Sequence, residues 1–155
     1  MMAGSHVAIG LAAWTLAAPV LGLPPLSPAA LALAAAGALL PDIDHPHSWL
    51  GRRLPLVSRP LAALLGHRGV THSLLAVAGC AWLLAAQGVA RGIVAPLALG
   101  ALSHLAADAL TPAGLRLGWP LRARVGLSLC RTGSAAEAAV VGAVVAAAGW
   151  RILGF

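Results

Sequence analysis

The stretch LLPDIDHPHS (residues 39–48) ends a long apolar run and contains two aspartates and two histidines. The chain has only four acidic residues, so half of them, Asp42 and Asp44, lie here. Pro41 stops the preceding helix and Pro46 stiffens the exit. Alternate residues of an extended segment point the same way, so Asp42 and Asp44 are expected to face one side. Acids at a helix end oppose the helix dipole, and a bound cation would remove that conflict.

The composition indicates a membrane protein. Of the 155 residues, 60% are hydrophobic and 9% are charged, and the mean hydropathy is +0.91. A soluble domain carries about 25% charged residues. So few charges cannot cover a soluble particle of this size, and most of the surface is expected to face lipid. The length suits a single domain, residues 1–155. The two cysteines form no CxxC motif, which argues against redox chemistry.

Five apolar runs are candidates for membrane-embedded helices, since a helix needs about 20 apolar residues to cross a bilayer. They cover residues 5–22, 29–40, 71–90, 93–110 and 135–155, and the second is too short to cross comfortably alone. Arg91 and Gly92 mark a tight turn between the third and fourth runs. The first run lacks a basic segment before it, which favours a retained span over a signal peptide. We therefore predict an all-α polytopic membrane helical bundle of about five membrane-embedded helices, with two long loops on one side, at 41–70 and 111–134.

Charges are distributed unequally between the two faces of this bundle. The two long loops hold four arginines each, whereas the opposite face has only Arg91 and Arg151. Because arginine excess marks the cytoplasmic side, we predict that the amino terminus and both loops are cytoplasmic. Every acidic residue and every histidine falls on that same face. The spans were assigned from hydropathy alone, so this convergence independently indicates a functional site.

The motif SHLAAD (residues 103–108) places His104 and Asp108 four residues apart on one face of a helix. Ionisable side chains inside a span are costly in lipid and are candidates for function. The alternative is a hydrogen-bonded pair that only ties helices together.

The motif HRGVTHS (residues 67–73) contains two histidines five residues apart. On one straight helix they would diverge, so we place His67 in the loop and His72 in the first helical turn. Gly69 lets the backbone bend between them, so that both imidazoles can point to one centre. Thr71 is a candidate helix cap. The alternative is a pair of membrane-surface histidines.

Two further ionisable residues begin apolar runs. His6 follows Ser5, a natural N-cap, and a lone histidine there would usually be structural. Its position on the same face as the other ionisable residues makes it a candidate ligand. Glu137 completes a capping box with Ser134, which is a purely structural explanation for it. His47 has the weakest case and is expected to be exposed.

The candidate ligands together suit a metal centre. They are His6, Asp42, His45, His67, His72, His104 and Asp108. A catalytic zinc takes three protein ligands and a water, so seven ligands, or eight with Asp44, suit two ions. Two ions can activate water and stabilise both oxygens in phosphoester hydrolysis. Histidine with carboxylate fits zinc best and manganese as well. The chain contains no GxSxG, P-loop or HExxH motif.

Arginines accompany these motifs. The candidates for phosphate binding are Arg68, Arg116, Arg122, Arg124 and Arg131, because guanidinium groups bind phosphate oxygens in pairs. The alternative is attraction to anionic lipid headgroups, which suits Arg52 and Arg53 equally well. Nucleic acid is a poor fit, because the chain has neither an aromatic stacking platform nor a soluble basic domain.

The motifs LLPDIDHPHSWLG, GHRGVTHSLLAV, SHLAADALTPAG and TGS..E closely resemble the YdjM-like family of bacterial inner-membrane proteins, described from their motifs as metal-dependent hydrolases. The resemblance runs from His6 to Glu137. The family is distantly similar to the zinc-dependent phospholipase C and P1 nuclease group, which implies a helical, multi-metal, phosphoesterase-like site. It also implies location in the bacterial inner membrane.

The resemblance assigns metal binding to His6, Asp42, His67, His72, His104 and Asp108, and less directly to Asp44, His45 and Glu137. In the soluble relatives the amino terminus of the chain also takes part in metal binding. Five residues precede His6 here, so we expect that ligand to be missing or replaced.

The expected function is therefore membrane-embedded, metal-dependent hydrolysis of a phosphoester, such as a phospholipid or lipid-linked phosphate, by a metal-activated water at the cytoplasmic interface. Asp44 or Glu137 would handle the proton, and Arg68 with the arginines of the second loop would hold the phosphate. The alternatives are a metal-binding transporter or sensor and a non-catalytic scaffold. A transporter's ligands tend to lie near the midplane of the membrane rather than at one interface. The oligomeric state stays open.

Overall fold

The structure, a computed structural model, describes residues 1–65, 69–121 and 123–154. These residues form six α-helices and two short 3₁₀ helices, and their only bridge of β type joins Leu115 to Val125. The elements are α1 (Ala3–Ala17), α2 (Pro28–Leu39), η1 (Leu40–Asp44), α3 (Pro55–Leu65), η2 (Val70–His72), α4 (Leu74–Ala86), α5 (Arg91–Ala109) and α6 (Ala135–Ile152). The predicted all-α class is confirmed.

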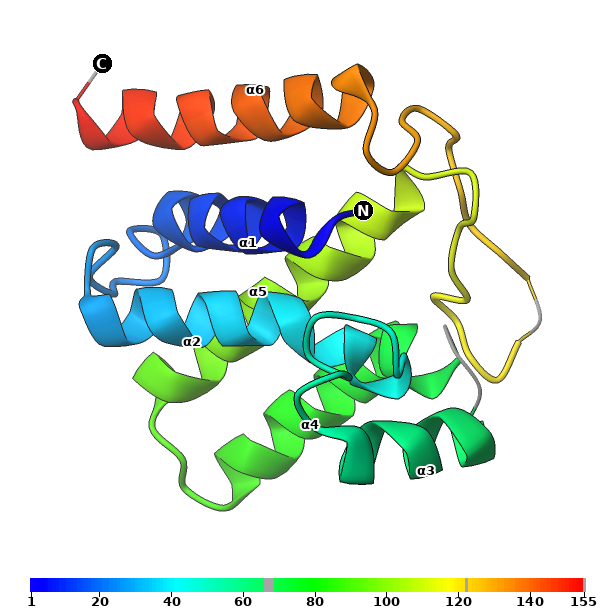
Figure 1. Cartoon of the computed structure of the whole chain (residues 1–155). Coiled ribbons are helices and arrows are strands. Elements are labelled where there is room, and N and C mark those ends of the chain that lie inside the picture. The colour runs from blue at the N-terminus through cyan, green and yellow to red at the C-terminus, as the bar shows by residue number, and fades with distance from the viewer. Residues whose placement is uncertain (66–68, 122, 155) are drawn as a thin grey trace.

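Helices α1, α2 and α5 pack against one another at the centre of the bundle (Figure 1). Helix α6 lies along α1, α4 packs on α5, and α3 lies beside η1. Glycines allow the central helices to approach closely. A Cβ atom on Gly37 would lie 2.2 Å from the Leu97 carbonyl oxygen, and one on Gly100 would lie 2.1 Å from that of Ala34. The tight crossing of α2 and α5 therefore requires glycine at both positions.

Serine side chains begin three of the helices. Ser27, Ser73 and Ser134 accept hydrogen bonds from backbone N–H groups in the first turns of α2, α4 and α6. The predicted cap at Ser134 is confirmed, whereas Ser73 rather than Thr71 caps α4. These caps fix where the chain leaves each loop, and so where the polar residues beside the helix starts lie.

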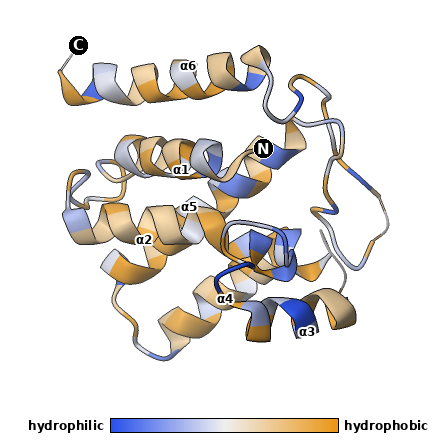
Figure 2. Ribbon diagram, viewed as in Figure 1, coloured by the Kyte–Doolittle hydropathy of each residue, from blue (hydrophilic) through white to orange (hydrophobic). Residues whose placement is uncertain are grey.

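Each of the five apolar runs overlaps one α-helix, and Figure 2 shows apolar residues along most of the helical surface. Among the described residues, two helices, α5 and α6, are long and apolar enough to cross a membrane by length and composition. Helices α1 and α4 are shorter. Crossing by all five runs stays a prediction.

Three local expectations were wrong. The segment 41–70, expected to be a loop, contains α3, whose Ser58 faces inward while Leu56 is 90% exposed. Its alternation of polar and apolar residues hid it from a search for continuous apolar runs. The turn expected at Arg91 and Gly92 lies just before them, where Gly88 adopts a positive φ of 76°. Helix α1 ends at Ala17 rather than continuing to residue 22.

Candidate metal centre

Four separate elements deliver ionisable side chains to one end of the bundle. His6 comes from α1, Asp42 from η1, His72 from η2, and His104 and Asp108 from α5. The three imidazoles and Asp108 are at most 1% exposed, and Asp42 is 20% exposed. The structure thus brings together five of the seven predicted metal ligands.

His6, His104 and Asp108 form the first of two triads, with one ligand atom from each lying within 4.8 Å of the others. His6 Nε2 is 3.4 Å from Asp108 Oδ1, and His104 Nε2 is 3.9 Å from Asp108 Oδ2. The i, i+4 spacing on α5 places the last two on one face, as expected.

Asp42, His72 and His104 form the second triad, and their ligand atoms also lie within 4.8 Å of one another. Asp42 Oδ1 lies 3.4 Å from His72 Nε2 and 3.7 Å from His104 Nε2. The buried Nε2 atom of His104 has no hydrogen-bond partner within the described part of the chain. A buried nitrogen facing two carboxylates fits the position of a metal ligand.

The two triads share that single nitrogen. His104 Nδ1 lies 2.7 Å from the Ala38 carbonyl oxygen, a contact that requires Nδ1–H to donate. The lone pair is then on Nε2, and one lone pair binds one ion. His104 therefore serves either triad but not both, and a second ion needs another ligand or a bridging carboxylate.

Asp44 lies behind His72 rather than among the ligand atoms. It is completely buried and accepts a hydrogen bond from the Thr71 hydroxyl. Asp44 Oδ2 is 3.6 Å and Thr71 Oγ1 is 3.0 Å from His72 Nδ1, the ring nitrogen opposite the one that faces Asp42. A carboxylate behind a ligating histidine fixes its tautomer and orientation. The sequence suggested only a capping role for Thr71, and its place beside Asp44 had no local signal.

Opposite charges lie side by side in the second triad. Burial would lower the pKa of His72, but hydrogen bonds to Asp42 and Asp44 outweigh burial and raise it above its usual value. Burial would raise the pKa of Asp42, but the hydrogen bond from His72 and the neighbouring histidine charges hold it below its usual value. The site is therefore arranged to balance carboxylates with positive charge, which a divalent cation also supplies.

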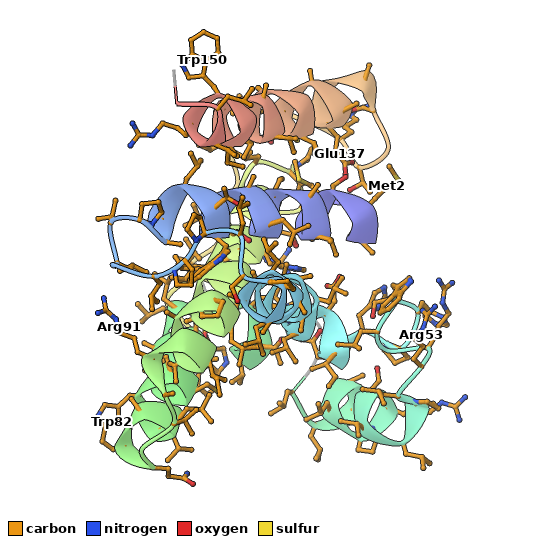
Figure 3. All side chains as sticks on the ribbon, turned by 90° about the vertical axis from the view of Figure 1, so that its left-hand side faces the viewer. Met2, Arg53, Trp82, Arg91, Glu137 and Trp150 are labelled. Carbon is orange, nitrogen blue, oxygen red and sulfur yellow. The ribbon has the colours of Figure 1, made fainter. Side chains whose placement is uncertain are left out.

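The amino-terminal residues also reach the cluster, contrary to expectation. The amino group of Met1 lies 2.8 Å from Asp108 Oδ1. The next residue, Met2, donates its backbone N–H to Glu137 Oε1 at 2.8 Å, and Gly133 donates to Oε2 at 2.6 Å. Figure 3 shows Met2 and Glu137 beside each other where α6 begins. The buried Glu137 thus joins α6 to the segment that precedes His6.

The remaining predicted residues lie elsewhere or outside the described residues. The ring of His45 lies edge-on to that of His47, with ring centroids 5.9 Å apart. His45 belongs to neither triad found among the described residues. Arg116 is half-buried, and Arg124 and Arg131 are exposed. His67, Arg68 and Arg122 lie outside the described residues.

The structure thus defines an α-helical protein with two candidate membrane spans and a buried histidine and aspartate cluster that could hold a metal ion. The chain belongs to the YdjM inner membrane protein family, whose model matches residues 1–154. The predicted family is therefore confirmed.

Two relatives illustrate this membership. The inner membrane protein YdjM of Escherichia coli is 48% identical over 101 residues, which cover 59% of this chain and 49% of that protein. The chain thus spans about half the length of this curated relative. The uncharacterized protein YvsG of Bacillus subtilis is 38% identical over 142 residues, 91% of this chain and 88% of that protein. No solved structure gives a significant match.

Proposed function

We propose that the chain is a membrane-embedded, metal-dependent hydrolase of a phosphoester, such as a phospholipid or a lipid-linked phosphate. The observation that carries the proposal is the position of His104 Nε2, buried at 3.7 Å from Asp42 and 3.9 Å from Asp108. Two other imidazoles, of His6 and His72, adjoin it.

The donor set fits a divalent ion. Buried carboxylates and imidazoles without a counter-ion are costly, and a cation in their midst offsets that cost. Mixed histidine and carboxylate ligands suit zinc first and manganese second. Each triad supplies three ligands, which leaves a fourth tetrahedral position for water. Because the triads share one nitrogen, one ion is supported directly, and a second would need a ligand such as His67.

The described residues divide the work around such an ion. When bound, zinc supplies a water that ionises near neutral pH. His104 and Asp108 would hold the ion together with His6, or His104 and Asp42 would hold it with His72. Asp44 orients the ring of His72.

Asp44 and Glu137 were both predicted to handle the proton. The contacts of Glu137, which accepts backbone N–H groups with both oxygens, better support a positioning role. Asp44 accepts a hydrogen bond from the Thr71 hydroxyl, and this contact likewise better supports a positioning role for Asp44. The phosphate would be held by arginines of the second loop, of which Arg116 is the least exposed of those described.

The proposed setting is the cytoplasmic face of the inner membrane, with several helices crossing. The ligands lie toward helix ends, since His6 is in the first turns of α1 and Asp108 is one residue from the end of α5. This position favours a hydrolase at the interface over a transporter, whose ligands tend to lie near the midplane. A scaffold in which the metal only holds helices together is the remaining alternative.

Elemental analysis of detergent-purified protein tests the metal centre. The wild type should carry zinc or manganese, and His72→Ala and Asp108→Ala should each reduce the content. Metal-free, fully folded wild type would exclude the centre. Turnover of a generic phosphodiester by the metal-loaded wild type, reduced in each variant together with its metal content, separates the hydrolase from the scaffold.

A further inference from the structure

A groove of about 640 Å³ runs between α1 and α6. Its volume lies within the range of about 300–1,000 Å³ that is common for small-molecule sites. Met2 and Ser5 contribute to one wall, and Val141 and Val145 contribute to the other. Helix α6 lies along α1 in Figures 1 and 3. The groove follows α6 from Ser134 to Val145, and α1 lines it only with its amino-terminal turn, from Met2 to Ser5.

Glycines on the two walls leave this space open. A Cβ atom on Gly4 or on Gly142 would meet nothing within 4 Å. In the centre of the bundle, by contrast, a Cβ atom on Gly10 would lie 2.7 Å from the Ala38 side chain. Glycine thus serves close helix approach at the centre, whereas between α1 and α6 it leaves room that helix packing does not use.

The groove is polar at one end and apolar along its length. Ser5, Ser134 and Glu137 lie where α1 and α6 begin, and valines follow along α6. Helix α6 itself is little covered by protein, since only 11% of its span is buried. A molecule that matches this pattern has an apolar chain and a polar head.

The polar end adjoins the metal cluster. Ser5 precedes His6, a member of the first triad. The Met2 N–H is bound by Glu137, while the amino group of Met1 contacts Asp108, another member of that triad. A head group at this end would therefore lie beside the His6–His104–Asp108 triad.

We infer that the groove binds one acyl chain of a membrane phospholipid, with its headgroup directed to the metal cluster. The net charge of +6, and the exposed Arg131 in the loop that leads into α6, suit an anionic headgroup. The bound lipid enters laterally, between two helices. Its identification as the substrate rests on the proposed hydrolase function, but its binding does not.

Three proteins purified from bacterial membranes in mild detergent test this inference: the wild type, Gly142→Leu and Gly149→Leu. Gly149 is the matched control, because it lies on α6 with the same open space but outside the groove. Native mass spectrometry should find phospholipid on the wild type and on Gly149→Leu. Retention by Gly142→Leu should fall roughly tenfold or more, which corresponds to about 1.4 kcal/mol of lost binding. Equal retention in all three proteins would overturn the inference, as would a wild type without lipid.

Gly4→Leu fills the groove from the opposite wall and replaces Gly142→Leu if that variant does not fold. Metal content, measured on the same samples, separates the two proposals. Wild type that retains lipid but binds no metal keeps the groove and removes the hydrolase. Wild type that binds metal, with lipid retention that Gly142→Leu does not change, keeps the metal centre and removes the groove. A lipid-free dimer that Gly142→Leu converts to a monomer shows a second copy in the groove and overturns the inference.

Discussion

The imidazole rings of His6 and His104 stack face to face, with centroids 3.7 Å apart and planes inclined by 11°. Each ring directs its Nε2 atom toward Asp108, at 3.4 Å and 3.9 Å. The stack fixes both rings in one orientation, because neither can rotate without meeting the other. Ligands held in this way need little rearrangement to bind an ion.

Replacing His104 should affect metal binding more than replacing any other ligand. His104→Ala removes the nitrogen that both triads share, so its metal affinity should fall by more than the roughly 10–100-fold that loss of a supporting residue costs. His6→Ala leaves the second triad intact and should reduce affinity less. Competition titration with a zinc-sensitive dye measures both. Equal losses in the two variants would show that the triads are not alternatives.

Thr71 and Asp44 should act through His72. Thr71→Val removes the hydroxyl that Asp44 and His72 share, and Asp44→Asn weakens the acceptor behind the ring. Each should reduce zinc affinity by about 10–100-fold without abolishing binding. Thr71→Ser retains the hydroxyl and is the matched control. If Thr71→Val and Thr71→Ser bind zinc equally well, the positioning role is wrong.

Zinc binding should strengthen as the pH rises. His72 must be neutral to bind zinc, and its pKa is raised in the metal-free protein. Protons therefore compete with zinc for His72 even at pH values above about 6.5, the ordinary pKa of histidine. The folding stability of the metal-free protein should instead fall as the pH rises. The stability that protonated His72 contributes is complete below its unfolded pKa and is lost as the pH rises through the folded value. Zinc titrations and thermal melts between about pH 6 and 8 check both trends, and a flat zinc affinity would contradict the first.

The sequence predicts the helices best where the pattern is uniform. Continuous apolar runs marked five of the six helices, because a lipid-facing or buried helix needs no polar side. Helix α3 was missed because Ser58 and Arg59 interrupt its apolar residues. Which helices pack together could not be inferred, since the close approaches at Gly37 and Gly100 depend on backbone atoms from distant segments.

The site was predictable as a set of residues but not as a geometry. An apolar bundle gathers its scarce ionisable groups at one polar face, so the sequence alone indicated His6, Asp42 and His72 as candidates, and the structure places them in one cluster. Which carboxylate faces the other ligand atoms and which lies behind a histidine was not predictable. Asp42 and Asp44 are two residues apart and alike in sequence, yet η1 turns one toward His104 and the other behind His72. The hydrogen bond from Met2 to Glu137 could not be predicted either, because 135 positions separate the two residues.

The contrast between tight and open glycines gives a stability prediction. Gly100→Ala forces a methyl group to within 2.1 Å of the Ala34 carbonyl oxygen, so α2 and α5 must separate, at a cost of about 1–3 kcal/mol. Gly142→Ala meets no atom and replaces a poor helix former, so it should be neutral or stabilising by up to about 1 kcal/mol. Thermal melts of both variants in one detergent measure the difference. Because α5 carries His104 and Asp108, Gly100→Ala should also weaken zinc binding, whereas Gly142→Ala should not. Equal melting temperatures would mean that the two helices cross less tightly than the structure shows.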